Sequence, residues 1–480
     1  MFCVAIVNTI MLDHINQRRR RMKSISRRGF LSQTATAGMG MTAAVAGGGI
    51  RTEAAMSNDE RAELCFMDQY YYGILDIANG IRDTQLPNIV KAMEKAYELK
   101  RKGGTLASHA NYGHFSMFAG TRDRPGQPWL LPQCGITPAQ EEFDALKAGD
   151  FLITNRIEAG TVGLREKGVY VVGVTNNYYK FAETPPNGLG AYRMEHSIEE
   201  LSDMVIDSQT PWNNGLVTAP ELPHFKLCPS TGIAQFLVYW ACTASLATLI
   251  GSKGKDCPWK AATDYLDLAI ERFKMIGADR PKIDHVAKQW ADRVLGDGAR
   301  LLVYGHPQEM DAYGPTLTNN MYVNEACICA SGSMIAQTYT EFENDVKDTD
   351  IVLIGAFTSD NADEIRVARD ARRAGAFTTA FCPYATDGDS SGDRLFKEVD
   401  VAFNTYCDES AGVIAAKTFD EKVSPIAGIA GNLVHWMLTA QWTDHMARRG
   451  EMPYYWQGYH EFGGQEYDES VLPYFKKRGY

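Results

Sequence analysis

The sequence predicts an α/β protein with two tandem domains, each built on a mostly parallel sheet in a three-layer, Rossmann-like arrangement. Short β-branched and apolar runs, such as residues 169–175 and 351–355, alternate with longer segments of helical periodicity. Strands that follow helices in this order usually pair in parallel, with helices covering both faces of the sheet. The same order of elements occurs twice along the chain, which predicts two domains of similar fold.

Pairs of matching segments support an internal duplication. Residues 228–240 and 424–436 are identical at seven of 13 positions, at an offset of 196. Three shorter matches occur at offsets of 192, 197 and 200: residues 112–114 with 304–306, 203–205 with 400–402, and 150–153 with 350–353. A copied unit of about domain size explains this common order better than chance. Two such domains usually pack about a pseudo-twofold axis, with a ligand cleft near the junction.

Residues 1–55 have the features of an export signal and leader. Residues 26–31 read Ser-Arg-Arg-Gly-Phe-Leu and match a twin-arginine signal, and a weakly apolar stretch follows at 30–46. That stretch ends in Ala-Val-Ala, a typical cleavage pattern, and it is too short to span a bilayer well. We therefore expect a periplasmic or extracellular protein with no membrane span. The alternative is a basic, disordered tail.

Charge and cysteine content restrict the classes of partner and cofactor that the protein is expected to bind. Residues 1–55 carry a net charge of +6 and the whole chain −11, so the remainder carries −17. A surface this acidic disfavours nucleic acid and anionic lipid as partners. Nine cysteines follow Cys3 at dispersed positions, and no spacing fits a zinc or haem motif. We expect no metal and no cofactor.

The first domain is expected over residues 56–250. Helices are predicted at 60–81 and 88–101, the second ending at the glycine pair 103–104. The strands expected next are 105–110, 151–155, 169–175 and 204–207, with short helices at 161–167 and 198–202 and a long apolar helix at 230–250.

The second domain is expected over residues 259–449, after a linker at 251–258 that is rich in glycine and proline. Predicted helices occupy 259–276, 283–295, 316–331, 362–374 and 425–447, and predicted strands 300–304, 351–355, 376–381 and 399–404. The tail, 450–480, is dense in aromatic residues, so we expect it to wrap the other domain or a partner subunit in a homo-oligomer.

Residues 148–161 and 167–175 resemble the centre of a sugar isomerase (SIS) domain. In that family a strand ends in a loop containing glycine and serine or threonine, a helix follows, and a Gly-x-x-hydrophobic-hydrophobic strand comes next. Residues 201–207, 215–217 and 229–231 resemble the closing portion of the domain, and 350–355, 362–381, 400–404 and 425 match in the second unit. The resemblance covers roughly residues 60–450. It rests on the order of the matching segments and on their recurrence in the second unit, and it implies two tandem SIS-type domains.

The strand-to-helix loops supply candidate sugar-binding residues. Free N–H groups at a helix start favour anionic or hydroxyl-rich ligands, and the resemblance implies that such loops hold a sugar phosphate. The candidates are Asn155, Arg156, Gly160 and Thr161 in the first loop and Thr358, Ser359 and Asn361 in the second. Nearby carboxylates, such as Asp360, disfavour a phosphorylated ligand in the second loop. The alternative is ordinary helix capping by Thr161, Ser359 or Asn361.

Candidate catalytic groups are two histidines and two glutamates. His114 and His306 each end a Tyr-Gly-His turn after the first strand of a unit, where a ligand crevice opens in parallel sheets. The alternative is a structural histidine bonded to the backbone of its turn. Aldose–ketose isomerisation needs a base, commonly glutamate in SIS isomerases, and the candidates are Glu158 and Glu325. Asn320 shares one face of the predicted helix with Asn324, close to Glu325. The alternative is that these polar residues form an ordinary solvent-exposed face of the helix.

These features together predict an exported protein that binds a sugar or sugar derivative. The leading expectation is an isomerase of the aldose–ketose type, or a related lyase, that acts by proton transfer. The alternative is a non-catalytic sugar-binding or sensor protein of the same fold. A third hypothesis is an assembly protein whose aromatic tail makes the functional contacts.

Overall fold

The computed structural model describes twelve segments of the chain. They are residues 58–109, 128, 130–132, 140–155, 161–175, 198–211, 215–223, 226–305, 332–384, 392–407, 412–457 and 463–480. The chain divides into two compact units, residues 1–54 and 55–480, and all described residues belong to the second. The predicted positions of His114, His306, Glu158, Glu325, Arg156, Gly160 and Asn320 lie outside the described residues.

Two parallel sheets confirm the predicted α/β class. The first sheet has the order β1-β2-β3-β4, formed by Leu106–His109, Phe151–Thr154, Tyr170–Val174 and Met204–Ile206. The second has the order β11-β10-β9-β7-β8, formed by Val401–Asn404, Phe377–Cys382, Ile351–Gly355, Leu301–Gly305 and Gln337–Thr338. A separate antiparallel pair joins β5 (Gly215–Val217) to β6 (Leu227–Pro229).

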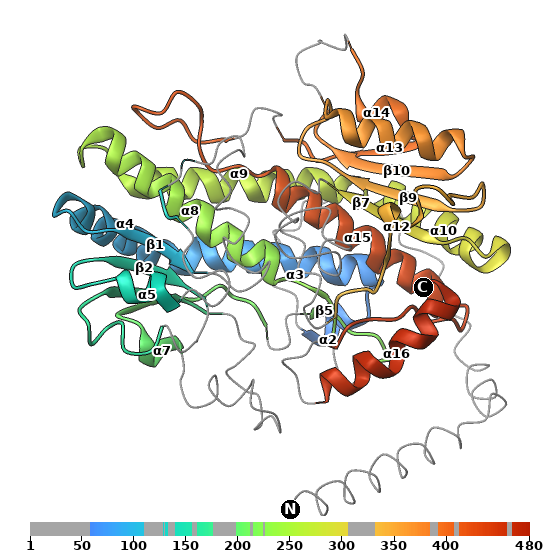
Figure 1. The fold of residues 1–480 in the computed structure, drawn as a ribbon, viewed down its shortest axis with the longest axis horizontal. Helices are drawn as coiled ribbons and strands as arrows, with labels where there is room; N and C mark the ends of the chain where they lie inside the picture. Colours follow the sequence, from blue (N-terminus) through green and yellow to red (C-terminus); the bar gives the residue numbers. More distant parts are fainter. Residues whose placement is uncertain are drawn as a thin grey trace, which may run out of the picture. The chain divides into compact units, whose positions relative to one another are not determined.

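Helices account for most of the other regular structure (Figure 1). The α-helices of the first half are α2 (Asn58–Ala62), α3 (Phe66–Gly80), α4 (Leu86–Arg101), α5 (Gln140–Ala145), α7 (Ile198–Leu201) and α8 (Thr231–Ser252). Those of the second half are α9 (Pro258–Ala278), α10 (Arg280–Asp297), α12 (Tyr339–Phe342), α13 (Ala362–Arg373), α14 (Leu395–Glu398), α15 (Ala427–Ala447) and α16 (Gly464–Arg478).

Each sheet is covered on both faces, as expected for a three-layer arrangement. Alternate residues of β9 divide between two apolar clusters: Ile351 and Leu353 join the large core, whereas Val352 and Ile354 pack with α13 and α14. This alternation arises because successive side chains of a strand point to opposite faces of the sheet. The first sheet divides in the same way, so its two faces also contact different clusters.

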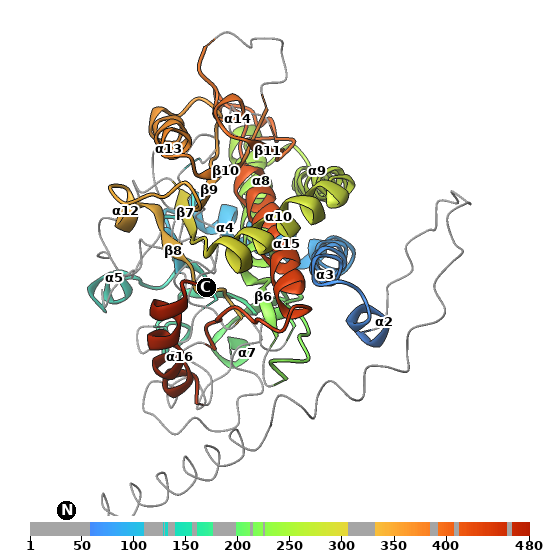
Figure 2. The same cartoon turned by 90° about the vertical axis from the view of Figure 1, so that its right-hand side faces the viewer.

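Two long apolar helices, α8 and α15, form the centre of the large core. α8 packs against α4 and α9, and α15 packs against α3 and α10, an arrangement that Figure 2 shows for α15. The large core therefore contains residues from both halves of the chain. α8 has the length and composition of a membrane-spanning helix, but 89% of its most apolar stretch is buried inside the protein.

Matching hydrogen bonds join β1 to β2 in the first sheet and β7 to β9 in the second. The Asp150 carboxylate accepts from the Thr105 N–H (2.7 Å) and the Lys147 N–H (2.9 Å). Asp350 repeats this with Lys347 N–H (2.8 Å) and with the backbone N–H and guanidinium of Arg300. Both carboxylates are almost fully buried, so these charge-assisted bonds fix the start of each strand pair.

A second set of matching contacts lies beside the two core helices. The Tyr70 hydroxyl donates to the carbonyl of Pro229 (3.1 Å), and the Tyr265 hydroxyl donates to the carbonyl of Pro425 (3.3 Å). The residues just before these prolines, Cys228 and Ser424, both have the left-handed backbone conformation, with φ of 59° and 64°. The chain thus enters α8 and α15 through the same uncommon turn.

One expected helix and one expected break between helices differ from the structure. Residues 161–168 form consecutive turns instead of the predicted helix, because Gly163 and Gly168 have φ of 80° and 84°, which an α-helix does not allow. The expected break between the first two helices is instead a π-helical segment, Ile81–Gln85, which connects α3 to α4 without a loop.

The predicted linker and tail take defined positions. Within the predicted linker 251–258, residues 253–257 join α8 to α9, and Gly251 belongs to α8. Glycine is needed there because a Cβ would overlap the carbonyl oxygen of Lys417. In the tail, Tyr455 forms a β-bridge with Met334, and α16 packs its Val471 and Phe475 against Ile335.

Candidate functional site

The carboxyl ends of the first sheet gather polar side chains at one edge. β1 and β2 end at His109 and Thr154, and the residues directly after β3 and β4 are Thr175 and Asp207. Parallel strands place these ends side by side, at the edge where α/β proteins bind ligands. This edge is the candidate site.

Six residues form an edge cluster, namely Thr175, Asp207, Ser208, Thr210, Thr231 and Gln235. The Thr175 hydroxyl donates to Asp207 (2.8 Å), and the Ser208 hydroxyl donates to the Thr175 carbonyl. The hydroxyls of Ser208 and Thr210 lie 2.8 Å apart. The Gln235 amide group donates to the Thr175 carbonyl at 2.7 Å. The cluster therefore ties the ends of β3 and β4 to the first turns of α8.

Two acceptors in this cluster have no hydrogen-bond partner within the described part of the chain: Gln235 Oε1 and Thr231 Oγ1. Both residues are fully buried. An unsatisfied buried acceptor costs about 1–3 kcal/mol, so such atoms are rare unless a ligand or water bonds to them. Gln235 and Thr231 lie one helical turn apart on α8, and both therefore face the same side of the helix.

The π-helical segment contacts the edge through its last residue, Gln85. Gln85, its last residue, accepts from the Asp207 N–H at 3.0 Å. The Asp207 carboxylate also accepts from the Gln209 N–H at 2.9 Å, which helps hold Gln209 at a φ of 60°. π-helical turns and left-handed non-glycine residues both occur often at functional sites.

His109 and Thr154 meet at the ends of the first two strands. His109 Nδ1 lies 3.3 Å from Thr154 Oγ1, and the ring packs edge-on against Phe143 with centroids 4.6 Å apart. His109 is fully buried, and the predicted sugar-binding residue Asn155 is 1% exposed just beyond Thr154. The predicted Thr161 is also buried, at the start of the consecutive turns.

The second sheet has a similar edge. One of the predicted sugar-binding residues in its loop has a structural role. The Asn361 side chain accepts from the Asp363 N–H at 2.9 Å and caps α13. Ser359 is buried and its carbonyl accepts from the Leu395 N–H, while Thr358 is half-buried. The alternative interpretation as a helix cap therefore holds at Asn361.

Two carboxylates lie near this second edge. Asp360 lies 3.5 Å from Arg394, and Glu364 is buried. Burial, followed by the negative charges of Glu364 and Asp363, raises the pKa of Tyr304 to about 12. Tyr304 thus remains a neutral hydroxyl at physiological pH.

The residues that face the first edge from α8 were not identified from the sequence. Ser230, at the N-cap of α8, makes no side-chain capping bond. The overlooked signal is Gln235, the one amide side chain of the largely apolar helix α8. Among the residues placed in the structure, there is no group of three or more metal-ligating side chains.

No protein-family model and no curated protein matches the sequence. Solved structures with a similar chain course include a candidate phosphosugar isomerase from Silicibacter pomeroyi, at 14% identity and a TM-score of 0.37 over 82% of this chain and 100% of that one. A candidate sugar-binding protein from Salmonella typhimurium has 14% identity and a TM-score of 0.42 over 77% and 99% of the two chains. A candidate phosphosugar isomerase from Clostridium difficile has 12% identity and a TM-score of 0.41 over 80% and 93%. Identities and TM-scores this low do not identify an activity.

Proposed function

We propose that the protein binds a sugar or sugar derivative at the carboxyl edge of its first sheet. The observation that carries this proposal is the pair of buried acceptors, Gln235 Oε1 and Thr231 Oγ1, which have no partner in the described residues. Sugar hydroxyls are suitable donors for both atoms, and a sugar hydroxyl can also accept from the Thr231 hydroxyl. A neutral, hydroxyl-rich ligand fits this site better than an anion, because Asp207 is its neighbour.

We infer that the two halves are copies of an SIS-type unit. The support is the sequence repeat together with the paired bonds of Asp150 and Asp350 and of Tyr70 and Tyr265. An SIS-type assignment favours isomerisation by proton transfer, with Glu325 or Glu158 as the base and His114 or His306 assisting. Residues 26–31 further support export by the twin-arginine route.

The second candidate function is sugar binding without catalysis. Asp207 is the carboxylate of the edge cluster, and one of its oxygens already accepts from Thr175 and Gln209. With that oxygen engaged in two bonds, Asp207 has a structural role at the edge, which favours binding over proton transfer.

A two-step experiment separates these functions. Thermal unfolding of the full-length protein with neutral and phosphorylated sugars identifies a ligand, because binding to the folded state raises the midpoint. Incubation of that ligand with the protein in deuterated water then tests isomerisation, which introduces deuterium at C1 or C2 of the sugar.

Matched variants assign the base. We expect exchange to fall at least 100-fold in Glu325→Gln or in Glu158→Gln, and to stay unchanged in the other. Binding without exchange would favour the non-catalytic function. If no sugar from either set stabilises the protein, the sugar-binding proposal is wrong.

A further inference from the structure

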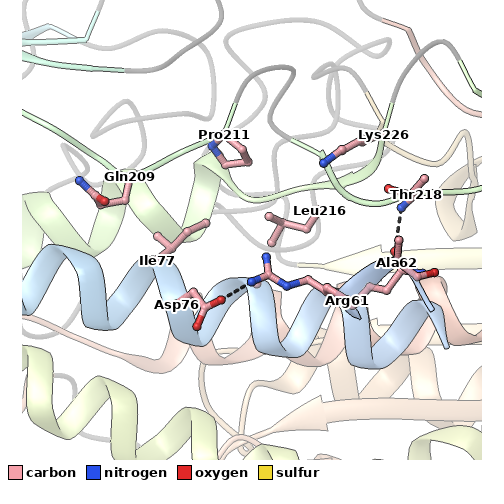
Figure 3. Close-up of a pocket in the computed structure, with 11 residues that line it drawn as sticks. Arg61, Ala62, Asp76, Ile77, Gln209, Pro211, Leu216, Thr218 and Lys226 are labelled. Atoms are coloured by element: carbon pink, nitrogen blue, oxygen red, sulfur yellow. Dashed lines mark hydrogen bonds and ion pairs between the residues drawn. The ribbon is translucent and has the colours of Figure 1, made fainter. Parts of the chain in front are cut away.

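A pocket of about 210 Å³ lies between the α2–α3 segment and the chain from Gln209 to Lys226 (Figure 3). Its volume corresponds to roughly seven water molecules at about 30 Å³ each, enough for a small organic ligand. None of its lining residues belongs to the edge cluster. It is therefore a second site, whose occupant need not be the sugar of the proposed function.

The walls of the pocket are fixed by packing and hydrogen bonds. Gln69 accepts from the Thr218 N–H at 2.8 Å and donates to the Leu64 carbonyl at 2.9 Å, which links the start of α3 to the residue that follows β5. Gly73 brings the helix close to Leu216, since a Cβ there would meet the Leu216 side chain at 2.9 Å. The pocket is thus formed without a ligand.

The charges of the described lining residues do not balance. They are Arg61, Lys226 and Asp76, which together give a net charge of +1 when all three are ionised. Arg61 is 14% exposed and pairs with Asp76. No carboxylate among the described residues pairs with the half-buried Lys226. Burial and then the positive charge of Arg61 lower the pKa of Lys226, so an anion between the two cations would relieve an unfavourable contact.

We propose that this pocket binds a small carboxylate of the hydroxy-acid or sugar-acid class between the Arg61 guanidinium and the Lys226 ammonium. Figure 3 shows both side chains lining the same space, with Gln209 further along it. A guanidinium binds the two oxygens of a carboxylate side by side, and the ammonium adds a point charge. The Gln209 amide can bond to a hydroxyl of the ligand. A monocarboxylate matches the net charge of +1, whereas a phosphate dianion would exceed it and approach Asp76.

The chain offers a matched control for Lys226. A Cβ at Gly215 would overlap the carbonyl oxygen of Lys226, and a Cβ at Gly412 would overlap that of Lys422, so the two lysines occupy corresponding places in the two halves. Lys422 is exposed and does not line the pocket. Both Lys226→Met and Lys422→Met therefore remove a lysine from this place in the fold. Only Lys226→Met removes a charge from the pocket.

The test is calorimetric titration of the full-length protein with D-gluconate, D-glycerate and inorganic phosphate, with D-glucose as the neutral comparison. We expect one carboxylate to bind with 1:1 stoichiometry, and more weakly as salt is raised from about 50 to 500 mM. Lys226→Met should weaken it at least tenfold, while Lys422→Met should leave it within twofold. Gln235→Met should also leave it within twofold, which separates this site from the proposed sugar site.

Three outcomes would overturn the proposal. They are the absence of binding by both carboxylates, equal affinity in Lys226→Met and the unmodified protein, and tighter binding of phosphate than of either carboxylate. If Lys226→Met does not fold, Lys226→Gln replaces it with a neutral side chain of similar length that keeps a polar end. Protection of Lys226 from an amine-reactive reagent by the carboxylate, mapped by mass spectrometry, gives a measurement that needs no variant.

Discussion

Replacement of Gln235 by methionine should remove ligand binding without lowering the stability of the protein. Gln235 donates to the Thr175 carbonyl at 2.7 Å, and losing this bond costs about 1 kcal/mol. The same replacement removes Oε1, a buried acceptor with no partner in the described residues, whose presence costs about 1–3 kcal/mol. Methionine has a similar shape and helix propensity. We therefore expect the free energy of unfolding to stay unchanged or to rise by up to about 2 kcal/mol.

Gln69→Met is the matched control for this prediction. Gln69 is also buried, but it donates to the Leu64 carbonyl and accepts from the Thr218 N–H, so both ends of its amide are bonded. Its replacement should lower the free energy of unfolding by about 2–4 kcal/mol. Urea unfolding followed by circular dichroism measures both variants. A loss of more than about 2 kcal/mol in Gln235→Met would refute the reasoning, because Oε1 would then be an occupied structural acceptor.

Three further sets of substitutions test the packing and the titration of the core. Gly412→Ala places a Cβ on a backbone oxygen and should cost more than about 2 kcal/mol in urea unfolding, whereas Gly296→Ala, with open space around it, should be neutral or stabilising. Tyr265→Phe and Tyr70→Phe should each cost about 1 kcal/mol, since each hydroxyl makes one matching bond; a twofold difference between them would argue against equivalent roles. Burial lowers the pKa of His435 from 6.5 to about 3. The unfolded chain therefore binds a proton that the folded chain does not, and stability falls as pH drops from about 6.5 towards 3, by about 2–3 kcal/mol at pH 4.5. His435→Gln should flatten this part of the profile, and an unchanged profile would contradict the assignment.

Much of the fold could be predicted from the sequence because strand periodicity and strand order are local signals. β9 and β10 lie within a residue of their expected bounds, since both are short and largely apolar runs. The π-helical segment at Ile81–Gln85 could not be predicted, because no residue type specifies it and its role is to bring Gln85 to Asp207. The turns at 161–168 depend on the positive φ of Gly163, which helical periodicity ignores.

The candidate site rests on residues that the sequence did not single out. Sequence reasoning placed the candidate residues, among them Asn155 and Thr161, in the loops after the strands, and both are buried; their role in binding stays a prediction. It missed Gln235, since a single glutamine in an apolar helix does not show by sequence whether its amide is satisfied. At Asn361 it left both ligand binding and capping open; the structure shows that the Asn361 side chain accepts from the Asp363 N–H and caps α13, and ligand binding there stays a prediction.

The most direct test is a crystal structure of the protein with a sugar that raises its unfolding temperature. The account predicts sugar hydroxyls within hydrogen-bond distance of both Gln235 Oε1 and Thr231 Oγ1, at the edge formed by Thr175 and Asp207. A sugar bound elsewhere, with these two acceptors bonded to the chain's own groups, would contradict it.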